Sequence, residues 1–362
     1  MDETISTQLN SKTDINCNAE NFYKNYWKSG EKIKSERDEL SNSILKKFFP
    51  NDISKNKVLE IGIGGEGGIV NTLKSTNEVY GVDISDSAIN LCKKLNLDVI
   101  KANLDSDIIP FMDNYFDIIF AFEVFEHFAN PQHAIEEIYR LLKEKGTLLI
   151  STPNRLTYHW PRLFYPTLFE QNEFENFLRI NNFEVKLDSQ SFYINRYRET
   201  NIKDSLKKWN NYFYCKKIGK NDSGAYFKNG LHFWNQKDNN GLRLFPIEAI
   251  DCFRKSLALN NNIFVRCFFT RALTYRAVYN DIDEFNNNMG ILVNLAESQN
   301  DINTNFVKFS ILMAELELKK FNLTVLSNKK FDEYLLLILN SGETNLINEI
   351  KEELNLVNKL FS

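Results

Sequence analysis

The sequence has no paired cysteine motif, no long apolar run and no surplus of basic residues. Its five cysteines are an odd number, and none lies in a C-x-x-C pair. That pattern excludes a disulfide scaffold and a thiolate zinc site, and it indicates a reducing compartment. No apolar run approaches the roughly 20 residues that cross a bilayer, and the polar first residues lack a signal-peptide pattern. We therefore expect a cytoplasmic protein with no membrane span.

The charge balance argues against a nucleic-acid partner. Lys and Arg number 44, Asp and Glu number 48, and the net charge is −4. Proteins that bind a phosphate backbone usually carry a basic surplus, so nucleic acid is disfavoured. The 362 residues, of which 43% are hydrophobic, are enough for two globular domains.

Short apolar runs alternate with helical patterns in the first part of the chain, after a polar stretch at residues 1–20 that we expect to be a disordered leader. Strands are predicted at residues 57–62, 78–83, 97–100, 116–122, 146–151, 183–189 and 211–219. Runs that are apolar throughout are typical of parallel strands covered on both faces. The best-marked helix spans Pro131 to Lys143, with Asn130 as its cap. We predict a doubly wound, mostly parallel, seven-stranded α/β sheet over residues 21–220.

Residues 221–362 show helical patterns only, so we predict an all-α domain there. The stretch FPIEAIDCFRKSLALNNN resembles the second helix of a tetratricopeptide repeat, with Ala249, Phe253 and Leu257 at four-residue spacing. The later helix pairs match that consensus poorly, so a small solenoid and an irregular bundle both stay open. Because this part of the sequence shows no pattern of catalytic or ligand-binding residues, we expect the domain to select the acceptor, bind a protein partner or self-associate.

A glycine-rich turn follows the first predicted strand. In VLEIGIGGEGG, Glu60 ends the strand, and Gly62 and Gly64 let a ligand approach the backbone without a Cβ clash. Asp83 ends the next strand, 21 residues after Gly62. An acid at that distance can reach the ribose hydroxyls of an adenosine. The glycines fit the G-x-G-x-x-G spacing of dinucleotide sites only in a shifted register, so NAD fits the turn poorly.

Over about residues 20–219 the chain resembles the class I S-adenosylmethionine-dependent methyltransferases, including those of the ubiquinone pathway. The resemblance rests on the glycine turn with Glu60 and on three later segments, ANLDSD (102–107), FDIIFAFEVFEH (116–127) and LLKEKGTLLISTPN (141–154). It implies a Rossmann-like methyltransferase that uses S-adenosylmethionine. It also implies a set of cofactor-binding residues, which are Glu60, Gly62, Gly64, Asp83, Ile84, Asn103, Leu104, Phe122 and Glu123. In this set Asn103 would reach the adenine amine, where many members of the family have Asp.

The EVFEH segment after the fourth strand holds the candidate catalytic residues. If it is helical, Glu123 shares one face with Glu126 and His127. Three interpretations stay open. In the first, His127 is a general base, with Glu126 beside it. In the second, Glu123, Glu126 and His127 bind Mg²⁺ or Zn²⁺, and His159 completes the set. In the third, Glu123 only presents its backbone to the cofactor, while Glu126 and His127 form hydrogen bonds to loops. The E-x-x-E-H pattern resembles both ubiquinone-pathway O-methyltransferases and small-RNA 3′-terminal 2′-O-methyltransferases.

An aromatic segment follows the fifth strand, at residues 154–183. In the resembled family this segment covers the substrate pocket, and aromatic faces suit a sugar ring, a quinone or another planar acceptor. Thr167 and Glu170 have capping-box spacing, so a helix is predicted to begin near Leu168. We expect Phe174 and Phe177 on that helix to face the core.

The leading hypothesis is a methyltransferase that acts on a hydroxyl or amine of a small molecule or saccharide, for instance in cell-surface glycan synthesis. One alternative is a metal-dependent RNA 3′-terminal 2′-O-methyltransferase, and another is a non-catalytic helical-repeat adaptor. Methyl transfer from a sulfonium needs positioning and water exclusion more than particular side chains. The sequence therefore identifies the cofactor better than the acceptor.

Overall fold

The chain divides into two compact units, Met1–Gly219 and Lys220–Ser362. The structure is a computed structural model, and the residues it describes are 34–51, 53–153, 169–188, 210–239, 241–277, 282–298, 302–321, 323–324 and 326–360. None of the helices in these ranges is long and apolar enough to cross a membrane.

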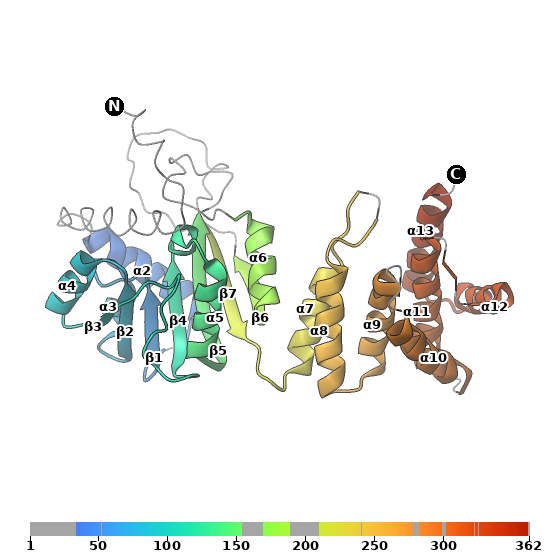
Figure 1. Cartoon of the computed structure of the whole chain (residues 1–362), viewed down its shortest axis with the longest axis horizontal. Coiled ribbons are helices and arrows are strands. Elements are labelled where there is room, and N and C mark those ends of the chain that lie inside the picture. Colours follow the sequence, from blue (N-terminus) through green and yellow to red (C-terminus); the bar gives the residue numbers. More distant parts are fainter. Residues whose placement is uncertain are drawn as a thin grey trace, which may run out of the picture. The chain divides into compact units, whose positions relative to one another are not determined.

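The first unit is built on a seven-stranded sheet in the order β3-β2-β1-β4-β5-β7-β6 (Figure 1). The strands are β1 (Lys57–Ile61), β2 (Glu78–Asp83), β3 (Asp98–Lys101), β4 (Phe116–Phe122), β5 (Leu142–Pro153), β6 (Phe183–Asp188) and β7 (Asn210–Lys217). Strands β1 to β5 pair in parallel, and β7 runs antiparallel between β5 and β6. This is the mostly parallel, doubly wound sheet that the sequence predicts.

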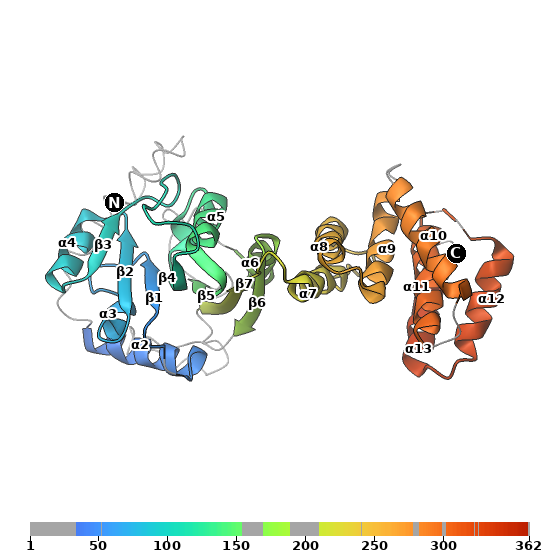
Figure 2. The ribbon, with the colours of Figure 1, turned by 90° about the horizontal axis from the view of Figure 1, so that it is seen from below.

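Helices cover both faces of this sheet (Figure 2). They are α2 (Lys34–Phe48), α3 (Val70–Leu73), α4 (Asp86–Lys94), α5 (Pro131–Leu141) and α6 (Gln171–Ile180). Neighbouring residues of one strand point to opposite faces. In β1, Val58 packs with the core under α2, α3 and α4, and Leu59 packs with the core under α5 and α6. Burial on both faces explains why the strands read as continuous apolar runs.

Two helix boundaries differ from those that the sequence predicts. Helix α5 ends at Leu141 instead of Lys143, because β5 begins at once and its Leu142 pairs with Phe116 of β4. Helix α6 begins at Gln171 instead of near Leu168. Its capping hydrogen bond runs from the backbone N–H of Glu170 to the Glu173 carboxylate, at 2.8 Å. Glu170 therefore precedes the helix, and Thr167, its predicted partner, lies outside the described residues.

The core side of α6 agrees with the prediction for its aromatic residues. Phe174 is fully buried, and Phe177 is partly buried against the same apolar cluster. Both rings also contact Phe125, which follows β4. The rest of the aromatic segment, residues 154–168, lies outside the described part of the chain.

The second unit contains helices alone among its described elements, with one isolated β-bridge in a loop. The helices are α7 (Ser223–Trp234), α8 (Pro246–Leu259), α9 (Ile263–Ala277), α10 (Asp283–Ser298), α11 (Ile302–Lys319), α12 (Asn328–Leu339) and α13 (Thr344–Leu360). Helix α11 packs against α9, α10, α12 and α13. Stacked helical hairpins bring every second helix into contact, as in the pairs α9–α11 and α11–α13.

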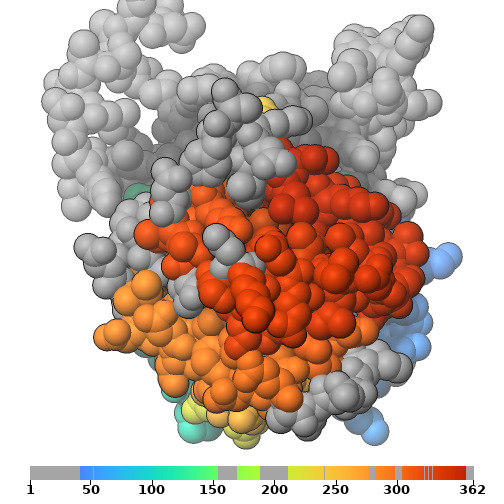
Figure 3. All heavy atoms as spheres, turned by 90° about the vertical axis from the view of Figure 1, so that its right-hand side faces the viewer, coloured from blue at the N-terminus to red at the C-terminus, as the bar shows by residue number. Residues whose placement is uncertain are grey.

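Large apolar side chains fill the centre of the second unit. In α8, Ala249 and Phe253 are fully buried and Leu257 is partly buried, as their four-residue spacing predicts. Phe253 lies directly against Gly230 of α7. The last helices, coloured orange to red, form the surface of this unit seen in Figure 3.

The close approach of α7 and α8 gives the first prediction. A Cβ on Gly230 would lie 2.5 Å from the Phe253 ring, so Gly230→Ala forces the ring to move. We expect the free energy of unfolding to fall by about 1–3 kcal/mol. The matched control is Gly290→Ala in α10, where nothing lies within 4 Å of the added Cβ; this change removes a helix-interior glycine and should gain about 0.5–1 kcal/mol. Denaturant unfolding followed by circular dichroism measures both, and equal effects would contradict the packing described here.

Candidate active site

The carboxyl ends of β1, β2 and β4 meet at one edge of the sheet. The strand order reverses between β1 and β4, because β2 and β3 lie on one side of β1 and β4 and β5 lie on the other. Open α/β sheets bind their ligands in the crevice that this reversal creates. The glycine turn, Asp83 and the EVFEH segment all leave the sheet at this edge.

The turn after β1 has a backbone that glycine adopts without strain. Gly62, Gly64, Gly67 and Gly68 have φ angles of 69°, 65°, 80° and 56°. A Cβ on Gly62 would also lie 2.8 Å from a methyl carbon of Val124, which follows β4. The turn therefore passes close to the EVFEH segment with no side chain between them.

Glu60 acts on this turn from inside the fold. Its side chain is buried, and its Oε2 accepts a hydrogen bond from the backbone N–H of Val70 at 3.1 Å. The same carboxylate fills the space that a Cβ on Gly68 would need. Glu60 thus fixes the end of the turn against the start of α3.

Asp83 joins the glycine turn to the turn after β2. Its Oδ2 accepts a hydrogen bond from the backbone N–H of Gly64 at 2.9 Å, and its Oδ1 accepts one from Ser85 at 2.8 Å. Each carboxylate oxygen can accept more than one hydrogen bond, so these bonds are compatible with ribose hydroxyls as further donors. Asp83 and the adjacent Ile84 are both half-buried. One further contact, which no sequence pattern indicates, is the hydrogen bond that the Cys92 thiol donates to the Gly64 carbonyl at 2.9 Å.

The 102–107 loop is shaped by its own polar residues. The side-chain oxygen of Asn103 accepts from the backbone N–H of Asp105 at 3.1 Å, and the N–H of Asn103 donates to Asp107 at 2.8 Å. Leu104 buries its side chain, so it presents little of that side chain to a ligand. His133 is half-buried, and its Nδ1 lies 2.8 Å from the Leu104 carbonyl oxygen. His133 thereby ties the loop to the start of α5.

The EVFEH segment does not form the single helical face that we expected. Glu123 has a left-handed backbone with a φ of 50°, and only Phe125–His127 form a short 3₁₀ turn. The reason is that the chain still follows the sheet at Glu123, whose N–H donates to the Ser151 carbonyl of β5 at 3.2 Å. The Glu123 carboxylate also accepts a hydrogen bond from the Ser151 hydroxyl at 2.9 Å. Ser151 is a partner that sequence analysis missed.

Glu126 is a buried carboxyl group at the centre of this segment. Its side chain is 3% exposed, and its Oε2 has no hydrogen-bond partner among the described residues. Burial raises the pKa of Glu126 well above its ordinary value, and the charge of Glu123 raises it further. Its Oε1 lies 3.9 Å from Nε2 of His127, whose side chain is 15% exposed. Glu126 therefore retains a proton at pH values where an exposed glutamate has lost it.

Phe122 and the proposed metal ligands are also predicted at this edge of the sheet. Phe122, the last residue of β4, is half-buried and packs against Tyr212 of β7 with ring centroids 6.1 Å apart. Within the described ranges, no group of three or more His, Cys, Asp or Glu side chains is arranged to hold a metal ion. His159, the predicted fourth ligand, lies outside those ranges.

This combination of turn, acid and sheet matches a known protein family. Residues 59–150 match the family model of a methyltransferase domain. This segment is a class I methyltransferase domain. It contains the glycine turn, Asp83 and the EVFEH segment, and it covers β1 through most of β5. The predicted family, its S-adenosylmethionine cofactor and its Rossmann-like sheet are confirmed for this segment.

Individual known proteins are similar to part of this chain. An uncharacterized protein of Methanocaldococcus jannaschii is 34% identical over 147 residues, which are 40% of this chain and 59% of that protein. The ubiquinone biosynthesis O-methyltransferase of Coxiella burnetii is 30% identical over 160 residues, or 42% of this chain and 66% of that protein. A solved S-adenosylmethionine-dependent methyltransferase from Aquifex aeolicus is 20% identical, with a TM-score of 0.41, over 53% of this chain and 96% of its own. The chain thus spans about 60% of the length of the first of these relatives.

The buried carboxyl group of Glu126 gives a prediction for stability. Because its pKa is raised in the folded protein, the folded state binds its proton more tightly than the unfolded state does. The contribution of Glu126 to the stability of the folded state is therefore complete below the ordinary glutamate pKa, and it is lost as the pH rises through the raised pKa. Glu126→Gln mimics the protonated form, so its melting temperature relative to the parent should rise between pH 5 and pH 8. The control is Glu144→Gln at an exposed site, whose difference from the parent should not change with pH.

Proposed function

We propose that this protein binds S-adenosylmethionine at the carboxyl edge of its sheet and methylates a hydroxyl or amine group of a small molecule or saccharide. The bond from Gly64 to Asp83 carries the proposal, because it holds a ribose-binding acid against a turn that leaves room for a ligand. The family match over residues 59–150 supports it. S-adenosylmethionine fits these residues better than NAD does, since the glycines depart from the dinucleotide spacing.

Each residue at this edge has a role in the proposal. Gly62 and Gly64 provide a backbone without side chains, and Asp83 accepts hydrogen bonds from the ribose hydroxyls. The 103–104 loop lies toward the adenine, and Ile84, Phe122 and Glu123 contact the cofactor. Glu60 and His133 are positioning residues, because one holds the turn and the other holds the loop.

The bound cofactor supplies an electrophilic methyl group on a sulfonium. The protein's contribution is then to orient the acceptor, exclude water and remove the acceptor's proton. We propose that His127 takes this proton, because it is the more exposed member of the pair with Glu126. Glu126 lies beside it, with its Oε1 3.9 Å from Nε2 of the imidazole, and acts as a positioning residue for the ring.

A hydroxyl of a small planar or sugar-like molecule is the acceptor that we favour. One relative is named as a ubiquinone biosynthesis O-methyltransferase. The net charge of −4 gives no support to the RNA alternative. We further propose that residues 21–220 and 221–362 are separate domains, and that the helical one selects the acceptor or binds a protein.

The cofactor assignment predicts the effect of removing Asp83. In Asp83→Ala the ribose hydroxyls lose their acceptor, so S-adenosylmethionine should bind about 1–3 kcal/mol more weakly in titration calorimetry. Asp86→Ala is the matched control, because this exposed acid lies three residues after Asp83, pairs with Lys101 and should leave the affinity unchanged when it is removed. Binding of NAD in place of S-adenosylmethionine to the parent protein would contradict the proposal.

The catalytic assignment predicts the effect of removing His127. The assay incubates the protein with S-adenosylmethionine that carries a tritiated methyl group and with a panel of catechols, monosaccharides and a short RNA. We expect the tritium to be transferred to a catechol or a monosaccharide and not to the RNA. His127→Ala should then slow the transfer by about 10²–10⁴-fold with cofactor affinity retained. The parent rate should survive a chelator and rise with pH through the histidine range. An unchanged rate in His127→Ala would show that His127 is not the general base. Loss of activity in chelator, with recovery on adding Mg²⁺, would favour the metal interpretation.

A further inference from the structure

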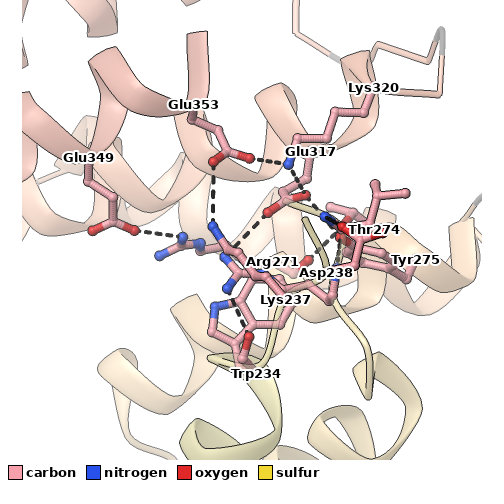
Figure 4. Close-up of polar contacts among 12 residues, drawn as sticks. Trp234, Lys237, Asp238, Arg271, Thr274, Tyr275, Glu317, Lys320, Glu349 and Glu353 are labelled. Carbon is pink, nitrogen blue, oxygen red and sulfur yellow. Dashed lines mark hydrogen bonds and ion pairs between the residues drawn. The ribbon is translucent and has the colours of Figure 1, made fainter. Parts of the chain in front are cut away.

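A network of charged side chains lies inside the helical unit (Figure 4). It joins three helices and the loop between α7 and α8. Its members are Lys237 and Arg243 of the loop, Arg271 of α9, Glu317 and Lys320 of α11 and the turn after it, and Glu349 and Glu353 of α13. Most of these side chains are buried, and buried charges are costly unless they are paired.

Without α13, this network has more positive than negative groups. Glu317 is shared, because it lies 3.5 Å from Arg243 and accepts a hydrogen bond from Lys320 at 3.0 Å. Arg243 also donates to the Trp234 carbonyl at 2.8 Å and lies over the indole ring. In this group only Glu317 offsets the positive charges of Lys237, Arg243, Arg271 and Lys320. We call Lys237, Arg271 and Lys320 the cationic surface, since these three make the bonds to α13.

Helix α13 supplies the missing negative charge. Glu349 and Glu353 are four residues apart and therefore lie on one face of the helix. Glu349 accepts from Arg271 at 3.0 Å, and Glu353 pairs with Lys320 and lies 3.8 Å from Lys237. Burial alone would raise the pKa of Glu353, but the hydrogen bond and charge of Lys320, together with the charges of Lys237 and Arg243, outweigh burial and lower it. Both carboxylates thus face the cationic surface, and Glu353 is ionised there.

Few of the described side chains of α13 are fully buried. Between residues 344 and 355, whose side chains are described, only Ile350 and Glu353 are buried. By contrast, α11 buries apolar side chains along most of its length. Leu346 and Leu354 add partly buried contacts to that of Ile350, so α13 is held by a narrow apolar stripe together with its charge pairs. When α13 detaches, hydration of the freed cations offsets part of the cost of breaking those pairs.

We propose that the cationic surface is a docking site for an acidic amphipathic helix of a partner protein, and that α13 occupies it in the isolated chain as an internal stand-in. The partner helix carries two carboxylates four residues apart, each followed by an apolar residue, as in Glu349-Ile350 and Glu353-Leu354 of α13. Binding of the partner displaces α13. The charge complementarity and the shallow apolar contact of α13 both support this exchange.

The first experiment releases α13 and then supplies a helix in trans. Glu349→Gln with Glu353→Gln removes both charges, and Glu352→Gln is the control because it removes an exposed charge of the same helix. The probe is a fluorescent peptide with the sequence of residues 343–360. We expect α13 amides to exchange at least about tenfold faster in the double variant. We also expect the peptide to bind the double variant at least about tenfold more tightly than the parent or the control, and a peptide with both glutamates changed to Gln to bind none of them.

Three results would overturn the proposal. The first is a double variant that releases α13 and yet does not bind the peptide. The second is unchanged exchange in α13, which would mean that the charges do not hold it. The third is a parent protein that forms dimers which the peptide dissociates, since the occupant would then be α13 of a second copy.

A second experiment needs no charge variant. A protease site placed in the loop at 340–343 allows α13 to be cut from the otherwise unchanged full-length chain. The cut helix should remain bound at high protein concentration, dissociate on dilution or in high salt, and be displaced by excess peptide while the other helices keep their circular dichroism signal. If the rest of the unit unfolds as α13 leaves, α13 is part of the core and the proposal is wrong.

Discussion

The hydrogen bond from the Gly64 backbone to the Asp83 carboxylate is the contact on which the whole candidate site depends. It joins the ends of β1 and β2, and it requires a turn that only glycines can form without strain. Gly62 then passes against Val124, so the segment after β4 is brought to the same edge. Three strand ends separated by tens of residues in sequence are thereby held within one small region.

A second set of contacts supports this edge from behind. Glu60 and His133 bond backbone atoms of the turn and of the 102–107 loop, while the Ser151 hydroxyl bonds Glu123. These side chains fix positions, and their loss would displace groups that contact a ligand. Preorganisation of this kind suits methyl transfer, because orientation of the acceptor toward the methyl group and exclusion of water account for most of the rate enhancement.

The two units use buried charge in opposite ways. In the α/β unit, Glu126 is buried near the charge of Glu123, and both raise its pKa, so that it keeps its proton. In the helical unit, Glu353 is buried beside lysines and gives up its proton, which favours a contact between helices. Burial penalises both ionised groups, so the sign of the neighbouring charge decides the outcome.

The amino-acid sequence by itself determined the sheet, the glycine turn with Asp83 and the all-helical second part. These follow from local patterns: apolar runs of strand length, glycines where φ is positive, and Ala249 and Phe253 at helical spacing. Only the tertiary structure decided how Glu123 and Glu126 lie, since the pairing of Glu123 with Ser151 of β5 keeps it out of the turn that holds Glu126 and His127. The same holds for His133 and for the charge network around Glu353, because hydrogen bonds and ion pairs between distant segments leave no periodic signal in the sequence.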